Sequence, residues 1–136
     1  MRSSKKCVSF GCAASASTAL VEVLVHLDAD AEDLPTDLLM LSIEAPARIY
    51  RKAERVAGDD PMLGNEMDAR DFGTRWLSEK RSALLLVPSV IVPMETNVLI
   101  NPLHADASAI RLKDKVPFLF DPRLLKRRSV PEPGGK

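Results

Sequence analysis

The strongest constraint on this fold is an apolar run that prolines interrupt on both sides of one serine. It reads LLLVPSVIVP over residues 84–93, and a second apolar run ends at Asn101-Pro102. Apolar runs of this length, bounded by proline, are typical of buried strands. Small polar residues where such strands end often build ligand sites, because the rigid sheet holds them in place. The sequence therefore predicts a sheet with a site beside Ser89.

The remaining pattern predicts helices and strands in a mixed order. Apolar residues at helical spacing predict helices over residues 15–27 and 68–80, the second with Phe72, Trp76 and Leu77 on one face. Four ranges predict strands: 38–43, 83–87, 98–100 and 116–120. Because the elements do not alternate as regular βαβ units, the pattern favours an α+β fold, a mixed sheet with packed helices, over a doubly wound sheet.

The connections are predicted from their turn-forming residues. Residues 91–92 are expected to continue the path of the strand at 83–87, and residues 105–110 to form a helical turn. Residues 57–67 are rich in Gly, Asp and Pro, which predicts a mobile loop. Residues 47–56 fit either a helix or a strand.

Composition excludes several classes of protein. A chain of 136 residues suits one domain, and 46 % apolar residues suffice for a packed core. A net charge of zero and 4 % aromatic residues argue against direct nucleic-acid binding, since phosphate binding needs a basic face. No apolar run approaches the roughly 20 residues that span a membrane, and the basic start is too interrupted for a secretory signal. We expect a cytoplasmic protein with no membrane segment, no metal site and no prosthetic group.

Three polar residues, Glu22, Ser89 and Asn97, are candidates for chemistry. Glu22 lies among Val and Leu residues of the first helix, where a carboxylate is costly to bury without a task, although the helix could turn it to solvent. His26 shares that helical face and could hydrogen-bond Glu22 or pack as a structural residue. Ser89 lacks a Gly-x-Ser-x-Gly elbow, so it fits a hydrogen-bond donor at a cleft, or a serine at a strand bend, better than a hydrolase nucleophile. Asn97 fits a pocket lining or a turn.

Together these segments resemble the RES family, the toxins of bacterial RES–Xre toxin–antitoxin pairs, named after an arginine, a glutamate and a serine. The resemblance covers residues 16–124. The motifs that carry it are LVEVLVHL at 20–27, GTRWL at 73–77, VPS at 87–89, NVLINPLH at 97–104 and FDPRL at 120–124. The resemblance implies an ADP-ribosyltransferase-like fold. It also implies that Glu22 and Ser89 are catalytic, and that Ser89 and Asn97 bind NAD⁺.

The same resemblance implies a reaction and a partner. NAD⁺ would be the substrate, cleaved at the nicotinamide–ribose bond, with ADP-ribose passed to water, phosphate or a protein. A carboxylate near the ribose would stabilise the positive charge that develops there, as in glycoside cleavage. An Xre-type antitoxin would neutralise the toxin, in a complex that allows a toxin homodimer.

One family segment has no counterpart in this sequence. RES proteins carry a Gly-Gly-Arg-Trp-Asn-like motif before the first helix, whereas residues 1–15 contain no such arginine. We therefore expect an atypical segment over 1–15, a RES domain over 16–124 that lacks the arginine segment, and a disordered tail over 125–136. The alternative function is a truncated, inactive RES remnant that retains only a protein-interaction surface.

Overall fold

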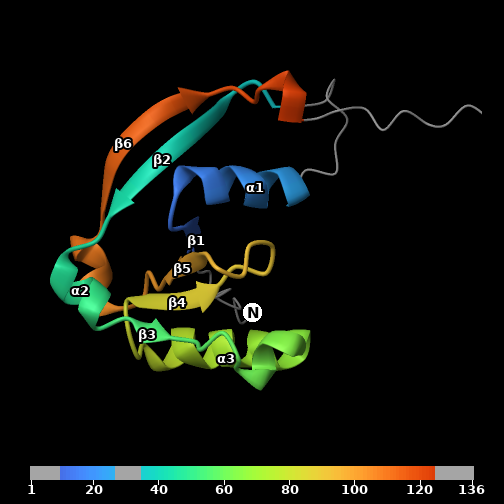
Figure 1. Ribbon diagram of the computed structural model, residues 1–136. Helices are drawn as coiled ribbons and strands as arrows, with labels where there is room; N and C mark the ends of the chain where they lie inside the picture. The colour runs from blue at the N-terminus through green and yellow to red at the C-terminus, as the bar shows by residue number, and fades with distance from the viewer. Residues whose placement is uncertain (1–9, 27–34, 125–136) are drawn as a thin grey trace, which may run out of the picture.

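The computed structural model describes residues 10–26 and 35–124, which form two sheets and three α-helices (Figure 1). The predicted tail over 125–136 lies outside these residues, and so does most of the predicted atypical segment over 1–15. The helices are α1 (Ala16–His26), α2 (Ala47–Arg51) and α3 (Glu66–Glu79). The strands are β1 (Phe10–Ala13), β2 (Leu38–Glu44), β3 (Glu54–Arg55), β4 (Leu84–Pro88), β5 (Thr96–Ile100) and β6 (Arg111–Phe118). Short 3-10 helices are η2 (Pro61–Gly64), η3 (Ala105–Ala109) and η4 (Pro122–Leu124).

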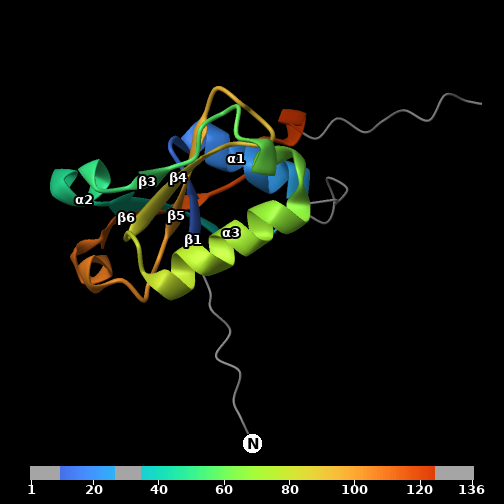
Figure 2. The same ribbon diagram turned by 90° about the horizontal axis from the view of Figure 1, so that it is seen from below.

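The larger sheet has the strand order β1-β5-β4-β3 and confirms the predicted α+β class. Strand β5 runs antiparallel to both β1 and β4, whereas β3 runs parallel to β4, so the sheet is mixed. Helix α3 packs along one side of this sheet, as the view from below shows (Figure 2). Strand β1 was not predicted, because its four residues, FGCA, carry no alternating pattern.

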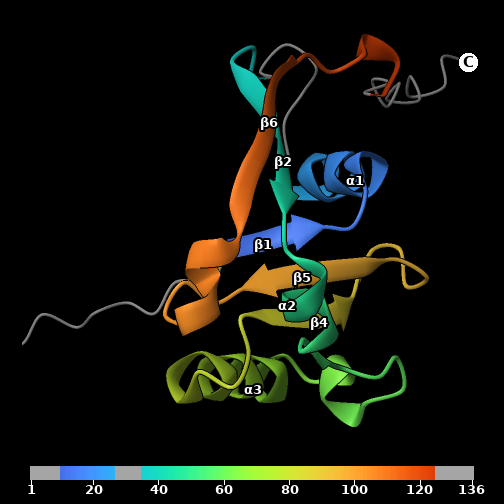
Figure 3. The same ribbon diagram turned by 90° about the vertical axis from the view of Figure 1, so that its left-hand side faces the viewer.

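The second sheet is an antiparallel ribbon of β2 and β6 that rises away from the first (Figure 3). It pairs Leu38 with Phe118 at one end and Glu44 with Arg111 at the other, with an irregularity between Ser42 and Ile43. Helix α1 lies at the β1 side of the larger sheet, near the ribbon (Figures 1 and 3).

The core has two parts because successive residues of β4 point to opposite faces of the sheet. On one face Leu85 packs with Val56, Leu77 and the fully buried Trp76 of α3. This contact confirms the predicted apolar face of that helix. On the other face Leu84 clusters with Ile49 of α2 and Ala83.

Both ends of helix α3 have a defined conformation. The Asn65 side chain accepts hydrogen bonds from the backbone N–H groups of Met67 and Asp68, at 3.0 and 3.2 Å, which satisfies two free donors of the first turn. Lys80 ends the helix in the left-handed conformation, with φ at 52°. Trp76 Nε1 donates to the buried Ser82 hydroxyl at 2.8 Å and ties the helix to the start of β4.

Two predictions at strand ends are wrong. Residues 91–92 do not continue β4; residues 89–95 form a turn, and β5 then returns antiparallel. The prolines at 88 and 93 have no N–H to donate to a neighbouring strand, which favours this turn. The last strand covers 111–118 instead of 116–120, and its Pro117 is tolerated because β6 pairs on one side only among the described residues.

The structure also shows the conformation of the ranges 47–56, 57–67 and 105–110. The ambiguous range 47–56 contains both a helix, α2, and a strand, β3, and the predicted helical turn is η3. Part of the predicted mobile loop at 57–67 is the 3-10 helix η2, where Asp60 accepts a hydrogen bond from Met62 N at 3.0 Å. Met62 packs against the Trp76 cluster, so this segment buries more than its composition indicates. Within the described ranges, no helix is long and apolar enough to cross a bilayer.

Candidate active site

Three polar side chains that are distant in the sequence meet at one carboxylate oxygen. Glu22 Oε1 accepts a hydrogen bond from Ser89 Oγ at 2.6 Å and another from Asn97 Nδ2 at 2.9 Å. These bonds join residues 67 and 75 positions apart. The structure thus brings together all three residues that the sequence singled out.

Glu22 is presented by α1, which starts at a serine cap. The Ser15 hydroxyl accepts a hydrogen bond from Thr18 N at 3.2 Å and lies 2.9 Å from the Thr18 hydroxyl. Thr18, Glu22 and His26 recur every four residues and therefore share one face of the helix. Thr18 is buried on this face, and the Glu22 side chain remains 22 % exposed. The helix therefore does not turn Glu22 freely to solvent.

Ser89 follows the last residue of β4 and is 1 % exposed. Its hydroxyl donates to Glu22 and accepts hydrogen bonds from Ile91 N at 3.3 Å and Val92 N at 3.1 Å. Its own backbone N–H donates to the Glu95 carbonyl at 2.9 Å. Ser89 is therefore both a serine at a strand bend and a hydrogen-bond donor, whereas its predicted place at a cleft stays a prediction. The two amides of the turn were not predicted, because nothing local in the sequence announces them.

Asn97 lies on β5, paired with Ala13 of β1 on one side and Val87 of β4 on the other. Its amide nitrogen faces Glu22, as it must, because the amide oxygen would be repelled by a carboxylate. Its Oδ1 is buried and has no hydrogen-bond partner among the described residues. An unpaired buried acceptor costs about 1–3 kcal/mol, so the structure accepts a penalty to keep an amide here.

The surroundings of Glu22 favour its ionised form. The Ser89 hydrogen bond lowers the pKa of the carboxyl below its ordinary value, and the Asn97 hydrogen bond lowers it further. Partial burial opposes this shift, and the charge that His26 can carry supports it. His26 Nε2 lies 3.9 Å from Glu22 Oε2 and its side chain is 79 % exposed, so it neither packs nor hydrogen-bonds the carboxylate in this arrangement. Glu22 is therefore an anion across the physiological pH range.

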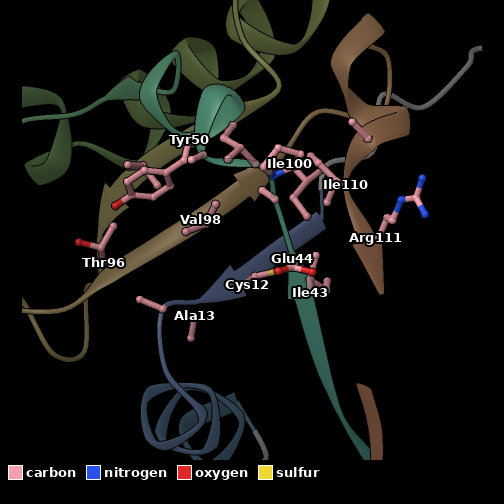
Figure 4. A pocket seen from close by; sticks show the side chains of 17 residues that line it. Cys12, Ala13, Ile43, Glu44, Tyr50, Thr96, Val98, Ile100, Ile110 and Arg111 are labelled. Atoms are coloured by element: carbon pink, nitrogen blue, oxygen red, sulfur yellow. The ribbon is translucent and has the colours of Figure 1, made fainter. Parts of the chain in front are cut away.

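A cavity of about 870 Å³ lies on the other face of β5 (Figure 4). Thr96, Val98 and Ile100 line it, and strand alternation turns the intervening Asn97 away from it. Glu22, Ser89 and Asn97 are not among its lining residues. The cavity lies between the larger sheet and the base of the ribbon, so it depends on contacts that no local pattern predicts. Among the described residues, no three His, Cys, Asp or Glu side chains gather as a metal site would require.

Comparisons with known proteins agree with the sequence motifs. A family model described as "RES domain" matches residues 10–121. A Sphingobium protein named "Prs ADP-ribosylating toxin" is 38 % identical over 120 residues, covering 85 % of this chain and 73 % of that protein. A Pseudomonas putida protein named "Toxin Res" is 38 % identical over 101 residues, covering 74 % of this chain and 69 % of that protein. A Yersinia enterocolitica "Toxin Res" is 34 % identical over 116 residues, covering 82 % of this chain and 74 % of that protein.

The match takes in all three site residues and both sheets. It begins at the first residue of β1, which is where the described structure begins, and it ends just after β6. With a family model over most of its length and relatives at this level of identity, the chain belongs to the RES domain family.

Proposed function

We propose that this protein is a RES-type toxin that consumes NAD⁺ and that Glu22 is its catalytic carboxylate. The observation that carries the proposal is the Glu22 carboxylate itself, held by two neutral donors on one oxygen. A carboxylate kept ionised and fixed in place is the group that cleavage of a ribosyl bond requires. The names of the relatives, one of them an ADP-ribosylating toxin, support this reading.

In the proposed reaction the bond between the ribose anomeric carbon and the nicotinamide nitrogen breaks. Its electron pair leaves with nicotinamide, and positive charge develops on the ribose. The Glu22 carboxylate stabilises that charge and can accept a hydrogen bond from a ribose hydroxyl. An acceptor oxygen or nitrogen then bonds to the anomeric carbon and releases its proton to solvent.

Water, phosphate and a protein side chain all remain acceptors under this proposal. The Sphingobium relative is named for ADP-ribosylating Prs, which supports a protein acceptor in that protein. The three outcomes differ in product: free ADP-ribose, ADP-ribose 1-phosphate, or a protein that gains an ADP-ribosyl group. Mass spectrometry of a reaction with lysate and phosphate present separates them.

We also propose that the toxin acts in the cytoplasm, where its substrate is found, and that an Xre-type antitoxin neutralises it. The "Toxin Res" names of two relatives support the toxin role. Co-expression of a neutralising Xre-type protein should restore growth, and the two proteins should co-purify. Growth arrest that persists with a stable antitoxin present would contradict this partner.

The proposed function is tested by cellular NAD⁺ after induction. Wild-type protein should deplete NAD⁺ and arrest growth, and Glu22→Gln should do neither while accumulating to the same level. Glu66→Gln is the matched control, because Glu66 is a helical glutamate with an exposed side chain whose ion pair is to Arg70 of the same helix. Depletion by Glu22→Gln at the wild-type rate, or none by wild type, would overturn the proposal.

A further inference from the structure

We infer that Ser89 and Asn97 are positioning residues: they hold Glu22 by Oε1 and leave Oε2 as the oxygen that meets the substrate. The inference rests on the proposed function for the identity of the substrate, but its geometry does not. It assigns the catalytic contact to Glu22 alone. It also gives the turn at residues 89–95 a role in orienting the carboxylate, because amides of this turn hold the Ser89 hydroxyl.

The hydrogen-bonding capacity of Ser89 is already used. A serine hydroxyl has one hydrogen to donate and two lone pairs to accept with. The hydrogen goes to Glu22 Oε1, and the lone pairs take the amides of Ile91 and Val92. With 1 % of its surface exposed, Ser89 has neither a free hydrogen for a substrate nor a lone pair open for nucleophilic attack.

Asn97 is held to Glu22 by one of the two N–H bonds of its amide group. Its amide nitrogen donates to Glu22 Oε1, and its Oδ1 is buried where no solvent reaches it. The residue is flanked by strands on both sides, so its side chain is held by the centre of the sheet. A ligand would have to displace Glu22 to take the N–H that Asn97 donates to Oε1.

Glu22 Oε2 has different contacts from Oε1. Within the described ranges it accepts no hydrogen bond, and the side chain nearest to it that can carry positive charge is His26, at 3.9 Å. Because Oε1 is fixed at two points, the carboxylate cannot rotate without breaking both bonds. Oε2 is therefore presented in one direction, available to a ribose hydroxyl.

The test uses the full chain with NAD⁺ as the probe and the variants Ser89→Ala and Asn97→Leu. Each should lower kcat by about 10- to 100-fold, the effect of one hydrogen bond to a charged group, and change KM by less than about threefold. A tenfold rise in KM with kcat unchanged would show that the residue contacts the substrate, and would overturn the inference.

A second readout needs no activity. NMR titration of isotope-labelled glutamate should show the pKa of Glu22 rising in both variants, because each loses a donor to the carboxylate. Unchanged titration in both would overturn the inference even if NAD⁺ is not the substrate. Conversely, full activity of Glu22→Gln would defeat the proposed function while leaving this titration valid. Asn97→Leu keeps the test decisive if Ser89→Ala does not fold.

Ser82→Ala is the matched control. Ser82 is also a buried serine that accepts two hydrogen bonds, from Trp76 Nε1 and Glu54 N, and donates one, to the Leu84 carbonyl. Its partners are structural and none belongs to the site. This variant should lose stability and keep both kcat and the Glu22 titration. A kcat as low as that of Ser89→Ala would show that buried serines act on the site only through stability, and would overturn the inference.

Discussion

Glu22 shows how a carboxylate can lie in an apolar helix without becoming neutral. Burial alone would raise its pKa, but the donors from Ser89 and Asn97 outweigh that cost and lower it. Neither donor carries a charge that could pair with a substrate phosphate. The site therefore stabilises its anion and leaves the charge available for chemistry.

A pH dependence follows from the lowered pKa of Glu22. The carboxylate should remain ionised at pH values where an ordinary glutamate, with a pKa of about 4.3, is already half protonated. NAD⁺ consumption should stay flat from neutral pH to about pH 5 and fall only below that ordinary value. Because the folded pKa is depressed, the stability that these bonds contribute is present above the unfolded pKa and is lost as pH falls through the folded pKa.

The pH–rate profile of wild type and Ser89→Ala checks this prediction. The acid limb of the variant should move to higher pH, since it lacks the Ser89 hydrogen bond that does most to lower the pKa of Glu22. Circular dichroism at each pH shows whether the chain is still folded. An acid limb at the same pH in both proteins would contradict the account.

At the residue scale, the main side chains of the site could be predicted from the sequence. Glu22, Ser89 and Asn97 could be named from motifs, and the structure places them in contact. The shared oxygen, the amides of Ile91 and Val92, and the exposed position of His26 could not be named. They depend on how a helix and a turn approach each other, which no local spacing encodes.

At the scale of the elements, a hydrogen bond from Trp76 to the buried Ser82 links α3 to the residues just before β4. Ser82→Ala removes the acceptor of Trp76 Nε1 and should lower the free energy of unfolding by about 1–3 kcal/mol. Urea denaturation followed by tryptophan fluorescence measures this directly, because Trp76 is the single tryptophan. Ser78→Ala, which removes an exposed hydroxyl bonded within the same helix, should change it by less than about 0.5 kcal/mol. Equal losses of stability in the two variants would mean that the buried hydrogen bonds of Ser82 contribute no more than the exposed bond of Ser78.

The two sheets should differ in local stability. Strand β4 is buried at residues 84–86 and is paired on both sides, whereas every residue of β6 before Phe118 is exposed. Two-stranded ribbons are marginally stable without further packing. Hydrogen exchange should therefore be faster in β2 and β6 than in β4 and β5. Equal protection of the ribbon in the isolated chain would contradict this.

The elements also show where sequence patterns are informative. Both long helices and the strands β2, β4 and β5 were predicted close to their observed bounds, because each has a clear apolar pattern and a stop signal. Strand β6 was predicted to begin five residues after its observed start. Its first half is exposed and rich in charged residues, so it lacks the apolar pattern of a buried strand. Strand β1 forms because it pairs with β5, a long-range contact that the sequence of β1 does not predict.

For the whole molecule, the two sheets and α1 create two distinct regions. One is the carboxylate site, assembled where α1 meets the ends of β4 and β5. The other is the open cavity on the opposite face of β5, bordered by the larger sheet, α2 and the base of the ribbon (Figure 4). The class of fold followed from the order of elements, whereas the relative placement of the sheets required the structure.

The central claim is that the Glu22 carboxylate drives cleavage of the nicotinamide–ribose bond. Release of nicotinamide from NAD⁺ by the purified chain tests it most directly, with wild type, Glu22→Gln and the control Glu66→Gln compared at equal folded concentration. The account predicts release by wild type and Glu66→Gln at similar rates, and a loss of at least about 100-fold in Glu22→Gln, the scale of removing a preorganised transition-state contact. Release by Glu22→Gln at a rate close to wild type would contradict it.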